Sequence, residues 1–319
     1  MIESEISYEE YLKSLKKDEL NSIVVNYNKL CSIYGFKKQE NKKLKKEALV
    51  NEILECLNDY LKGVIMSLDK EDFEAIKSIL KNNNNEELNQ NKNLINYLKS
   101  LKIIYQSDNL QIPKEILEVI KKLIKDKEVA NYIKENDYLY KLSEGIIIAY
   151  GVIDLNDFKE IIKHEYIIDL LDFYYKKDFD ITDEMLLSKK LTNKKRINKY
   201  YKDKDYQQFS LKDFLALGNN SYHHSIKAYK KFIKMLKNNY VFKKRDLDFV
   251  DINVVIPYLY NSLNEEEIAS KNLEDTVISL FEFKGEKLKQ KMLQEIKLIR
   301  KDFPLWEYRG HTKNEKEHE

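Results

Sequence analysis

The stretch SLDKEDFEAIKSILKNN, residues 67–83, is the clearest indication of the fold of this 319-residue chain. Asp69 is placed to cap a helix, and Phe73 begins a series of apolar residues that recur every three or four positions. The same period recurs along much of the chain. Glycine and proline, which sheets and tight turns need, number only seven and three. We therefore expect a mainly α protein whose long helices are joined by short polar turns.

The composition indicates a folded protein built from several modules. Apolar residues make up 43% and charged residues 34% of the chain, so cores can form and global disorder is excluded. The length suggests about two to four packing units. We expect four: a helical module at 1–60, a unit of two helices and a small β-hairpin at 61–125, a middle helical unit at 126–187 and a basic helical region at 188–319.

The cysteines and the lengths of the apolar runs indicate the cellular compartment. Cys31 and Cys56 are the only cysteines and lack CxxC spacing, which argues against a disulfide framework and a cysteine-based zinc site. No apolar run approaches the roughly 20 residues that span a bilayer. Residues 1–20 are charged and lack the apolar core of a signal peptide. We expect a cytoplasmic protein without a membrane span, and the sequence does not determine its oligomeric state.

Two similar hexapeptides, LKKDEL at 15–20 and LKKEAL at 44–49, each open an amphipathic helix. The stretch resembles the helical hairpin of SAP and Rho N-terminal modules, which bind DNA or RNA. That resemblance implies phosphate contacts at the start of the second helix, from Lys45 and Lys46. The alternative is a plain helical hairpin with a solvated lysine turn.

A helix expected at 93–101 is followed by KIIYQSDNLQIPKEI, residues 102–116, which indicates strand, turn, strand and helix. Helix, helix and hairpin is the order of a winged helix, and the segment resembles such units. The resemblance implies a reading helix in the major groove with Asn93, Asn96, Lys99 and Lys102 facing outward. A protein–protein module is the alternative, because the preceding helix begins with acidic residues.

Charge is strongly segregated towards the C-terminal part of the chain. Residues 188–245 contain 17 lysines and arginines and three aspartates, a net charge of +14 in a chain of net charge +2, so the rest carries −12. AT-rich coding explains many lysines, but it does not explain why 214–245 has no acidic residue. This segregation is the strongest functional indication in the sequence.

Within this region, SYHHSIKAYKKFIKMLKNNY at 221–240 predicts a basic amphipathic helix. Its lysines, including Lys237, fall on one face, and Ile226, Tyr229, Ile233, Leu236 and Tyr240 fall on the other. Nearby tyrosines, including Tyr206 and Tyr222, could stack on unpaired bases. The residues expected to hold phosphates are Lys194, Lys195, Arg196, Lys199, Lys227, Lys230, Lys231 and Lys234. The alternatives are an acidic surface of this chain or of a partner, and an anionic membrane surface.

The C-terminal stretch LIRKDFPLWEYRGHTKNE covers residues 298–315. It resembles the W-x-x-K/R-G-H-T-x-x-E segment that precedes the SEC-C zinc motif in bacterial proteins. The cysteine-rich zinc motif itself is absent here, so the resemblance implies no zinc. Trp306, Arg309 and His311 form either a plug that docks on the protein's own surface, which we favour, or a short recognition segment.

No pattern of catalytic residues stands out. The chain lacks a P-loop, a glycine-rich dinucleotide loop and HExxH. His223 and His224 are adjacent and are expected on different faces of a helix, a poor metal pair. We expect no enzyme activity, no catalytic residue, no metal and no cofactor. The predicted function is a regulatory protein that binds DNA or RNA. The alternative is an adaptor or inhibitor, of phage or mobile-element type, whose basic face docks on an acidic protein.

Overall fold

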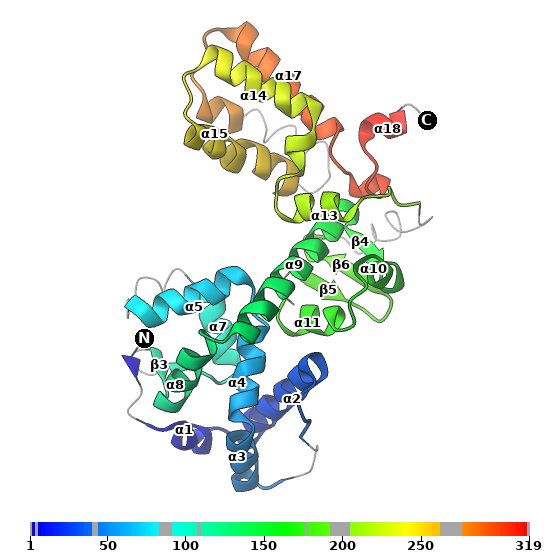
Figure 1. The fold of residues 1–319 in the computed structure, drawn as a ribbon. Coiled ribbons are helices and arrows are strands. Elements are labelled where there is room, and N and C mark those ends of the chain that lie inside the picture. The colour runs from blue at the N-terminus through cyan, green and yellow to red at the C-terminus, as the bar shows by residue number, and fades with distance from the viewer. Residues whose placement is uncertain are drawn as a thin grey trace. The chain divides into compact units, whose positions relative to one another are not determined.

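The computed structural model describes residues 2–3, 6–39, 44–82, 91–106, 110–175, 178–191, 205–261 and 276–317 (Figure 1). Helices dominate these residues, and the strands among them form two small three-stranded sheets. The expected mainly α class with a small β-hairpin is therefore confirmed. No helix in the described ranges is both long and apolar enough to cross a membrane.

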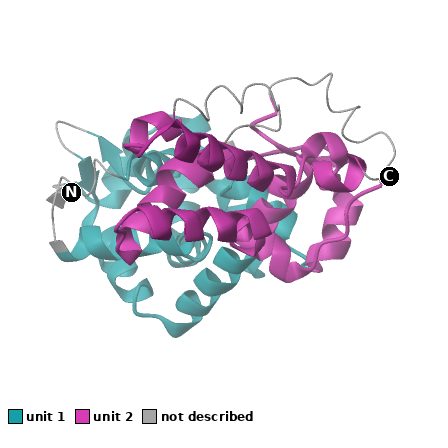
Figure 2. Ribbon diagram, turned by 90° about the horizontal axis from the view of Figure 1, so that it is seen from above, with its two compact units in different colours: residues 1–140, 164–176 teal, residues 141–163, 177–319 magenta. Residues whose placement is uncertain are grey.

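The chain divides by its internal contacts into two compact units (Figure 2). Unit 1 comprises residues 1–140 and 164–176, and unit 2 comprises residues 141–163 and 177–319. The boundary falls inside helix α9 (Lys127–Tyr150), whose residues are assigned partly to each unit. The modules expected at 1–60 and 61–125 both belong to unit 1, and the residues of 126–187 are divided between the two units.

Unit 1 is a helical assembly whose helix starts follow from local sequence. Its helices before α9 are α1 (Tyr8–Ser14), α2 (Lys17–Tyr34), α3 (Lys46–Glu55), α4 (Leu57–Met66), α5 (Lys70–Asn82), α7 (Lys92–Ser100) and α8 (Lys114–Leu123), and α11 (Ile167–Phe173) follows later in the chain. Asp69 accepts the backbone N–H of Asp72 and caps α5, as predicted. Phe73, Ile76 and Ile79 are buried, which confirms the inward face expected for this helix.

A small sheet lies beside these helices. Strands β2 (Tyr105–Gln106) and β3 (Leu110–Ile112) pair antiparallel, which confirms the expected hairpin, and β1 (Ile2–Glu3) pairs parallel with β3. The turn residues 107–109 lie outside the described residues. Pro113 is the N-cap residue of α8. A proline at this point favours an edge strand before it, but β3 is central in the order β1-β3-β2, because β1 from the start of the unit's sequence pairs with it as well.

Unit 2 contains a second sheet that the sequence pattern did not predict. Strands β4 (Val152–Asp154), β5 (Phe179–Ile181) and β6 (Met185–Ser188) pair antiparallel in the order β4-β6-β5. Its described helices are α10 (Leu155–Ile162), α13 (Leu211–Gly218), η1 (Tyr222–Ser225), α14 (Lys227–Asn239), α15 (Lys244–Val250), η2 (Asp251–Val255), η3 (Pro257–Asn261), α17 (Glu286–Lys301), η4 (Trp306–Tyr308) and α18 (Lys313–Glu317).

Two glycines let α9 and α13 approach closely within unit 2. A Cβ at Gly145 would lie 1.8 Å from the carbonyl oxygen of Phe214, and one at Gly218 would lie 1.9 Å from that of Lys141. Neither position accepts a side chain without moving a helix backbone. This contact holds α13, and the chain continues directly from α13 into η1 and α14, which carry the candidate site.

Candidate functional site

Helix α14 is held by its apolar face. Tyr229, Phe232 and Leu236 are buried, and the helix packs against α17 (Figure 1). Tyr229 and Leu236 lie where the helical period predicted them. Ile233, however, is only half-buried, and Phe232 takes the central place instead. Phe232 thus lies between Tyr229 and Leu236 on the inward face, three and four positions from them, as the helical period allows.

The opposite face of α14 is an exposed row of lysines. It consists of Lys227, Lys230, Lys231, Lys234 and Lys237, all exposed, and the helix contains no acidic residue. Within the described part of the chain, none of the five ammonium groups lies within ion-pair distance of a carboxylate. We call these five residues the lysine face. Their charges are therefore available to an external anion.

The other predicted phosphate contacts are placed differently. Lys194, Lys195, Arg196 and Lys199 lie outside the described residues. Lys45 is exposed at the start of α3, and Lys46 donates from Nζ to the backbone oxygen of Lys13 at 2.6 Å. The two lysines at the start of α3 thus differ, since Lys45 is exposed to solvent and Lys46 holds the chain of α1.

On the predicted reading helix, α7, the asparagines and the lysines behave differently. Asn93 and Asn96 are exposed. Lys99 donates to the side-chain oxygen of Gln106 at 2.9 Å. Lys102 forms an ion pair with Glu19 at 2.7 Å, across 83 residues of sequence. The basic charge at this end of α7 is partly neutralised within unit 1.

An aromatic groove begins where α14 ends. It has a volume of about 640 Å³ and is lined by Tyr240, Phe242, Phe249, Phe281 and Phe283 with several aliphatic and charged residues. Arg245 and Lys284 are balanced there by Asp246 and Glu282. The groove is therefore close to neutral, and it places flat apolar rings beside the C-terminal end of the lysine face.

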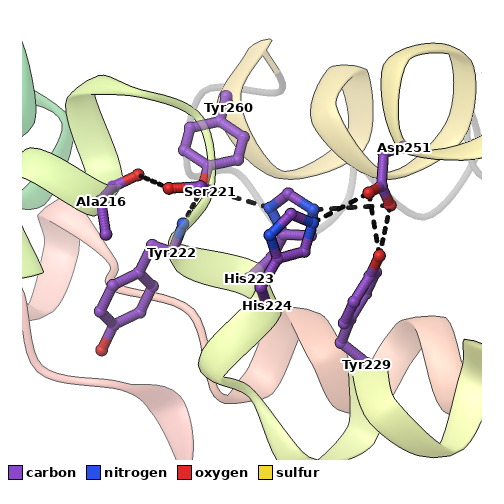
Figure 3. A network of polar contacts seen from close by, with 8 residues as sticks. All are labelled: Ala216, Ser221, Tyr222, His223, His224, Tyr229, Asp251 and Tyr260. Atoms are coloured by element: carbon purple, nitrogen blue, oxygen red, sulfur yellow. Dashed lines mark hydrogen bonds and ion pairs between the residues drawn. The ribbon is translucent and has the colours of Figure 1, made fainter. Parts of the chain in front are cut away.

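A second cluster of chemically active side chains lies at the start of α14 (Figure 3). The Nε2 atom of His224 lies 2.9 Å from Oδ2 of Asp251, and Nε2 of His223 lies 3.5 Å from Oδ1 of the same carboxylate. The hydroxyl of Tyr229 donates to both carboxylate oxygens, at 2.8 and 2.9 Å. We call His223, His224 and Asp251 the histidine–aspartate cluster.

The sequence predicted the adjacent histidines on different faces of a helix, and the structure shows that this prediction was wrong. Their ring centroids lie 4.3 Å apart, and both rings reach Asp251. The reason is the local backbone, because residues 222–225 form a single tight 3₁₀ turn rather than part of α14. The sequence could not reveal Asp251 either, since it lies 27 residues beyond His224 in the irregular helix η2.

The surroundings of Asp251 favour its charged form. Burial alone would raise the pKa of this carboxyl, but hydrogen bonds from His224 and Tyr229 and the nearby imidazole of His223 together hold it below its ordinary value. Burial and the neighbouring carboxylate raise the pKa of Tyr229, so its hydroxyl remains a hydrogen-bond donor. The cluster thus joins a negative charge to two imidazoles at a site that is open to solvent on the side of His224.

The tryptophan segment packs within its own unit. The indole N–H of Trp306 donates to the backbone oxygen of Ile148 at 2.9 Å, and its ring lies against Gly151, where no Cβ could be accommodated. Thr312 and Glu315 form a reciprocal cap at the start of α18. Part of the W-x-x-R-G-H-T-x-x-E pattern is therefore a helix cap.

The other two members of this segment, Arg309 and His311, also serve its local fold. Arg309 adopts a left-handed backbone conformation, and its backbone oxygen accepts the N–H of Gln207 at 3.1 Å. His311 is mostly buried, and its ring nitrogens lie 3.9 to 4.0 Å from the carboxylates of Glu315 and Asp205. The segment is thus tied to its neighbours on several sides.

Comparison with known proteins adds no relative: no protein-family model, no curated protein and no solved structure matches the chain.

Proposed function

We propose that this protein binds nucleic acid, with the lysine face of α14 as its main contact. The observation that carries the proposal is a row of five exposed lysines on a helix without acidic residues. From Lys227 to Lys237 the row extends about 15 Å along the helix, enough to meet several successive phosphates of one strand. Such contacts are electrostatic and tolerate many sequences.

The aromatic groove favours unpaired strands over duplexes. Proteins that bind single strands combine basic surfaces that follow the backbone with aromatic rings on which bases stack. The groove supplies rings such as Phe249, and the lysine face supplies the charge that the groove lacks. Each stacked base contributes about 1–3 kcal/mol by alanine substitution. We therefore propose single-stranded DNA or RNA as the ligand, bound for regulation rather than for chemistry.

The experiment is a fluorescence-anisotropy titration of the full chain with random-sequence single-stranded DNA, RNA and duplex DNA at roughly 50 and 200 mM salt. Binding should be tightest for a single strand and should weaken steeply with salt. The variant Lys230→Glu plus Lys234→Glu should bind at least about tenfold more weakly. The matched control, Lys121→Glu plus Lys125→Glu, changes the same charge at two exposed lysines of unit 1 and should bind as the wild type does.

Docking on an acidic protein is the second candidate. Exposed apolar side chains favour it: Val241, between the groove residues Tyr240 and Phe242, is fully exposed, and Phe249 in the groove is 54% exposed. A protein partner would depend on a few aromatic residues rather than on many lysines. If no nucleic acid binds even at the lower salt, the nucleic-acid proposal fails and this candidate takes its place.

A further inference from the structure

We propose that the histidine–aspartate cluster binds one divalent transition-metal ion of the Zn²⁺ class. The ligands are Nε2 of His223, Nε2 of His224 and a carboxylate oxygen of Asp251. One such atom from each residue can be chosen so that all three lie within 4.8 Å of one another. In a tetrahedral site with bonds of about 2.0–2.1 Å, ligand atoms lie about 3.4 Å apart. Nε2 of His224 lies 2.9 Å from Oδ2 of Asp251 and Nε2 of His223 lies 3.5 Å from Oδ1, so each imidazole is within about 0.5 Å of this distance from one carboxylate oxygen.

One buried nitrogen of the cluster lacks a hydrogen-bond partner among the described residues. The side chain of His223 is completely buried, and its Nε2 atom has no hydrogen-bond partner within the described residues. Leaving a buried polar atom without a partner destabilises the folded protein. The nitrogen is directed towards Asp251, whose carboxylate is 14% exposed. A bound cation would satisfy this nitrogen and balance the carboxylate charge together.

The groups around the ligands are arranged to orient them. The Nδ1 atom of His223 lies 3.4 Å from the hydroxyl of Tyr260, which itself accepts the backbone N–H of Tyr222 at 3.1 Å (Figure 3). An Nδ1–H that donates to Tyr260 leaves Nε2 free for a metal. Tyr229 holds the carboxylate from the other side. Metal-binding histidines and carboxylates normally have such outer partners.

The backbone that supplies Asp251 and Tyr260 is itself unusual. Both residues lie in π-helical stretches, η2 and η3, which follow each other closely. π-Helical turns are rare and occur frequently at functional sites. Here the wide turns bring Asp251 and Tyr260, nine positions apart, to the same imidazole of His223.

The donor set selects the kind of ion. Two imidazoles and one carboxylate suit Zn²⁺ and neighbouring transition metals, whereas Mg²⁺ and Ca²⁺ prefer oxygen ligands alone. Three protein ligands leave a position for water, and the half-exposed His224 places that position towards solvent. This inference does not depend on nucleic-acid binding, because none of the three ligands belongs to the lysine face.

The test is a titration of the full chain, without a histidine tag and freed of metal by chelation, with Co²⁺ followed by visible absorption and with Zn²⁺ followed by calorimetry. We expect saturation at one ion per chain and weaker binding as the pH falls, because protons compete for the imidazoles. No saturable binding of one equivalent by either ion would overturn the proposal.

Variants locate the ion. His224→Gln changes a half-exposed side chain, so the protein should fold, and it should weaken binding at least about tenfold. Tyr229→Phe keeps every ligand and should weaken binding about 10- to 100-fold through the loss of its hydrogen bonds. The control is His164→Gln, which removes a histidine paired with Glu135 at 3.1 Å in unit 1 and should leave binding unchanged. Equal affinity in His224→Gln and the wild type would also overturn the proposal.

Discussion

Helix α7 of unit 1 and helix α14 of unit 2 have polar faces of similar composition and different surroundings. Both are amphipathic, and both have asparagines and lysines on the polar face. At the end of α7, however, Lys102 is paired with Glu19 and Lys99 with Gln106, whereas the lysine face of α14 meets no carboxylate among the described residues. Periodicity predicts where a lysine points. Only the fold decides whether its charge remains available to a ligand.

The largest effect should come from the buried side of α14. Phe232→Ala removes a fully buried ring from the contact with α17 and should lower the free energy of unfolding of unit 2 by about 3–5 kcal/mol. Lys237→Ala, on the exposed side of the same helix, should change it by less than about 0.5 kcal/mol. Urea denaturation with amide exchange across α14 measures both. Similar losses of unfolding free energy in Phe232→Ala and Lys237→Ala would contradict the assignment of one face of α14 to the core and the other to solvent.

The next effect separates the two helices by their response to salt. Lys231→Ala should reduce the slope of log affinity against log salt for a single strand by roughly 0.7, because it removes one phosphate contact. Lys99→Ala should leave the slope unchanged, because its ammonium group is directed to Gln106 and lies outside the lysine face proposed to hold the phosphates. Anisotropy titrations over a range of salt concentrations provide the slopes. An equal reduction in both variants would make α7 a second contact helix.

Features that depend on nearby sequence were predicted well. The cap at Asp69, the hairpin around residues 105–112 and the exposed lysines of α14 all follow from spacing over a few positions. Helical periodicity is such a feature, because a side chain's direction depends only on its own turn. The omission of Phe232 from the expected inward face shows the limit of this reasoning, because burial of a particular apolar side chain also depends on the element packed against the helix, here α17.

Features that depend on distant partners could not be predicted. Glu19 and Lys102 are 83 positions apart, and Asp251 reaches His224 from 27 positions away. No spacing rule connects these residues. The histidine–aspartate cluster was missed for a further reason, since a 3₁₀ turn was not expected within SYHHSIK, residues 221–227. A histidine pair just before a helix is nevertheless a pattern that could have prompted a search for a distant carboxylate.

A smaller effect concerns the ion pair that neutralises Lys102. The hydrogen bond from Lys102, together with the backbone N–H of Lys16, holds the pKa of Glu19 below its ordinary value. A lowered carboxyl pKa stabilises the folded protein above the unfolded pKa of about 4.3, and this stability is lost as the pH falls through the folded pKa. Lys102→Gln should therefore cost about 0.5 kcal/mol near neutral pH and almost nothing in acid, because the pair is partly exposed.

Urea denaturation of wild type and Lys102→Gln at pH values above and below the carboxyl range measures this difference. Lys99→Gln serves as the control, because its partner Gln106 is neutral and its effect should not vary with pH. A difference for Lys102→Gln that persists in acid would mean that the side chain acts through packing rather than through charge.

The smallest effect is expected at the exposed asparagines of α7. Asn93→Ala plus Asn96→Ala should change stability by less than about 0.5 kcal/mol, since neither side chain is buried. It should also leave the affinity for random single strands unchanged, because the lysine face supplies the binding.

A helix that reads bases would behave differently: loss of an asparagine–adenine contact costs about 1–3 kcal/mol at one sequence and little at others. Competition titrations against a randomised duplex pool, with sequencing of the bound fraction, compare the sequence preferences of the wild type and the double variant. A sequence preference that the wild type has and the double variant lacks would show that α7 reads bases and that the partial neutralisation around Lys102 does not prevent it from doing so.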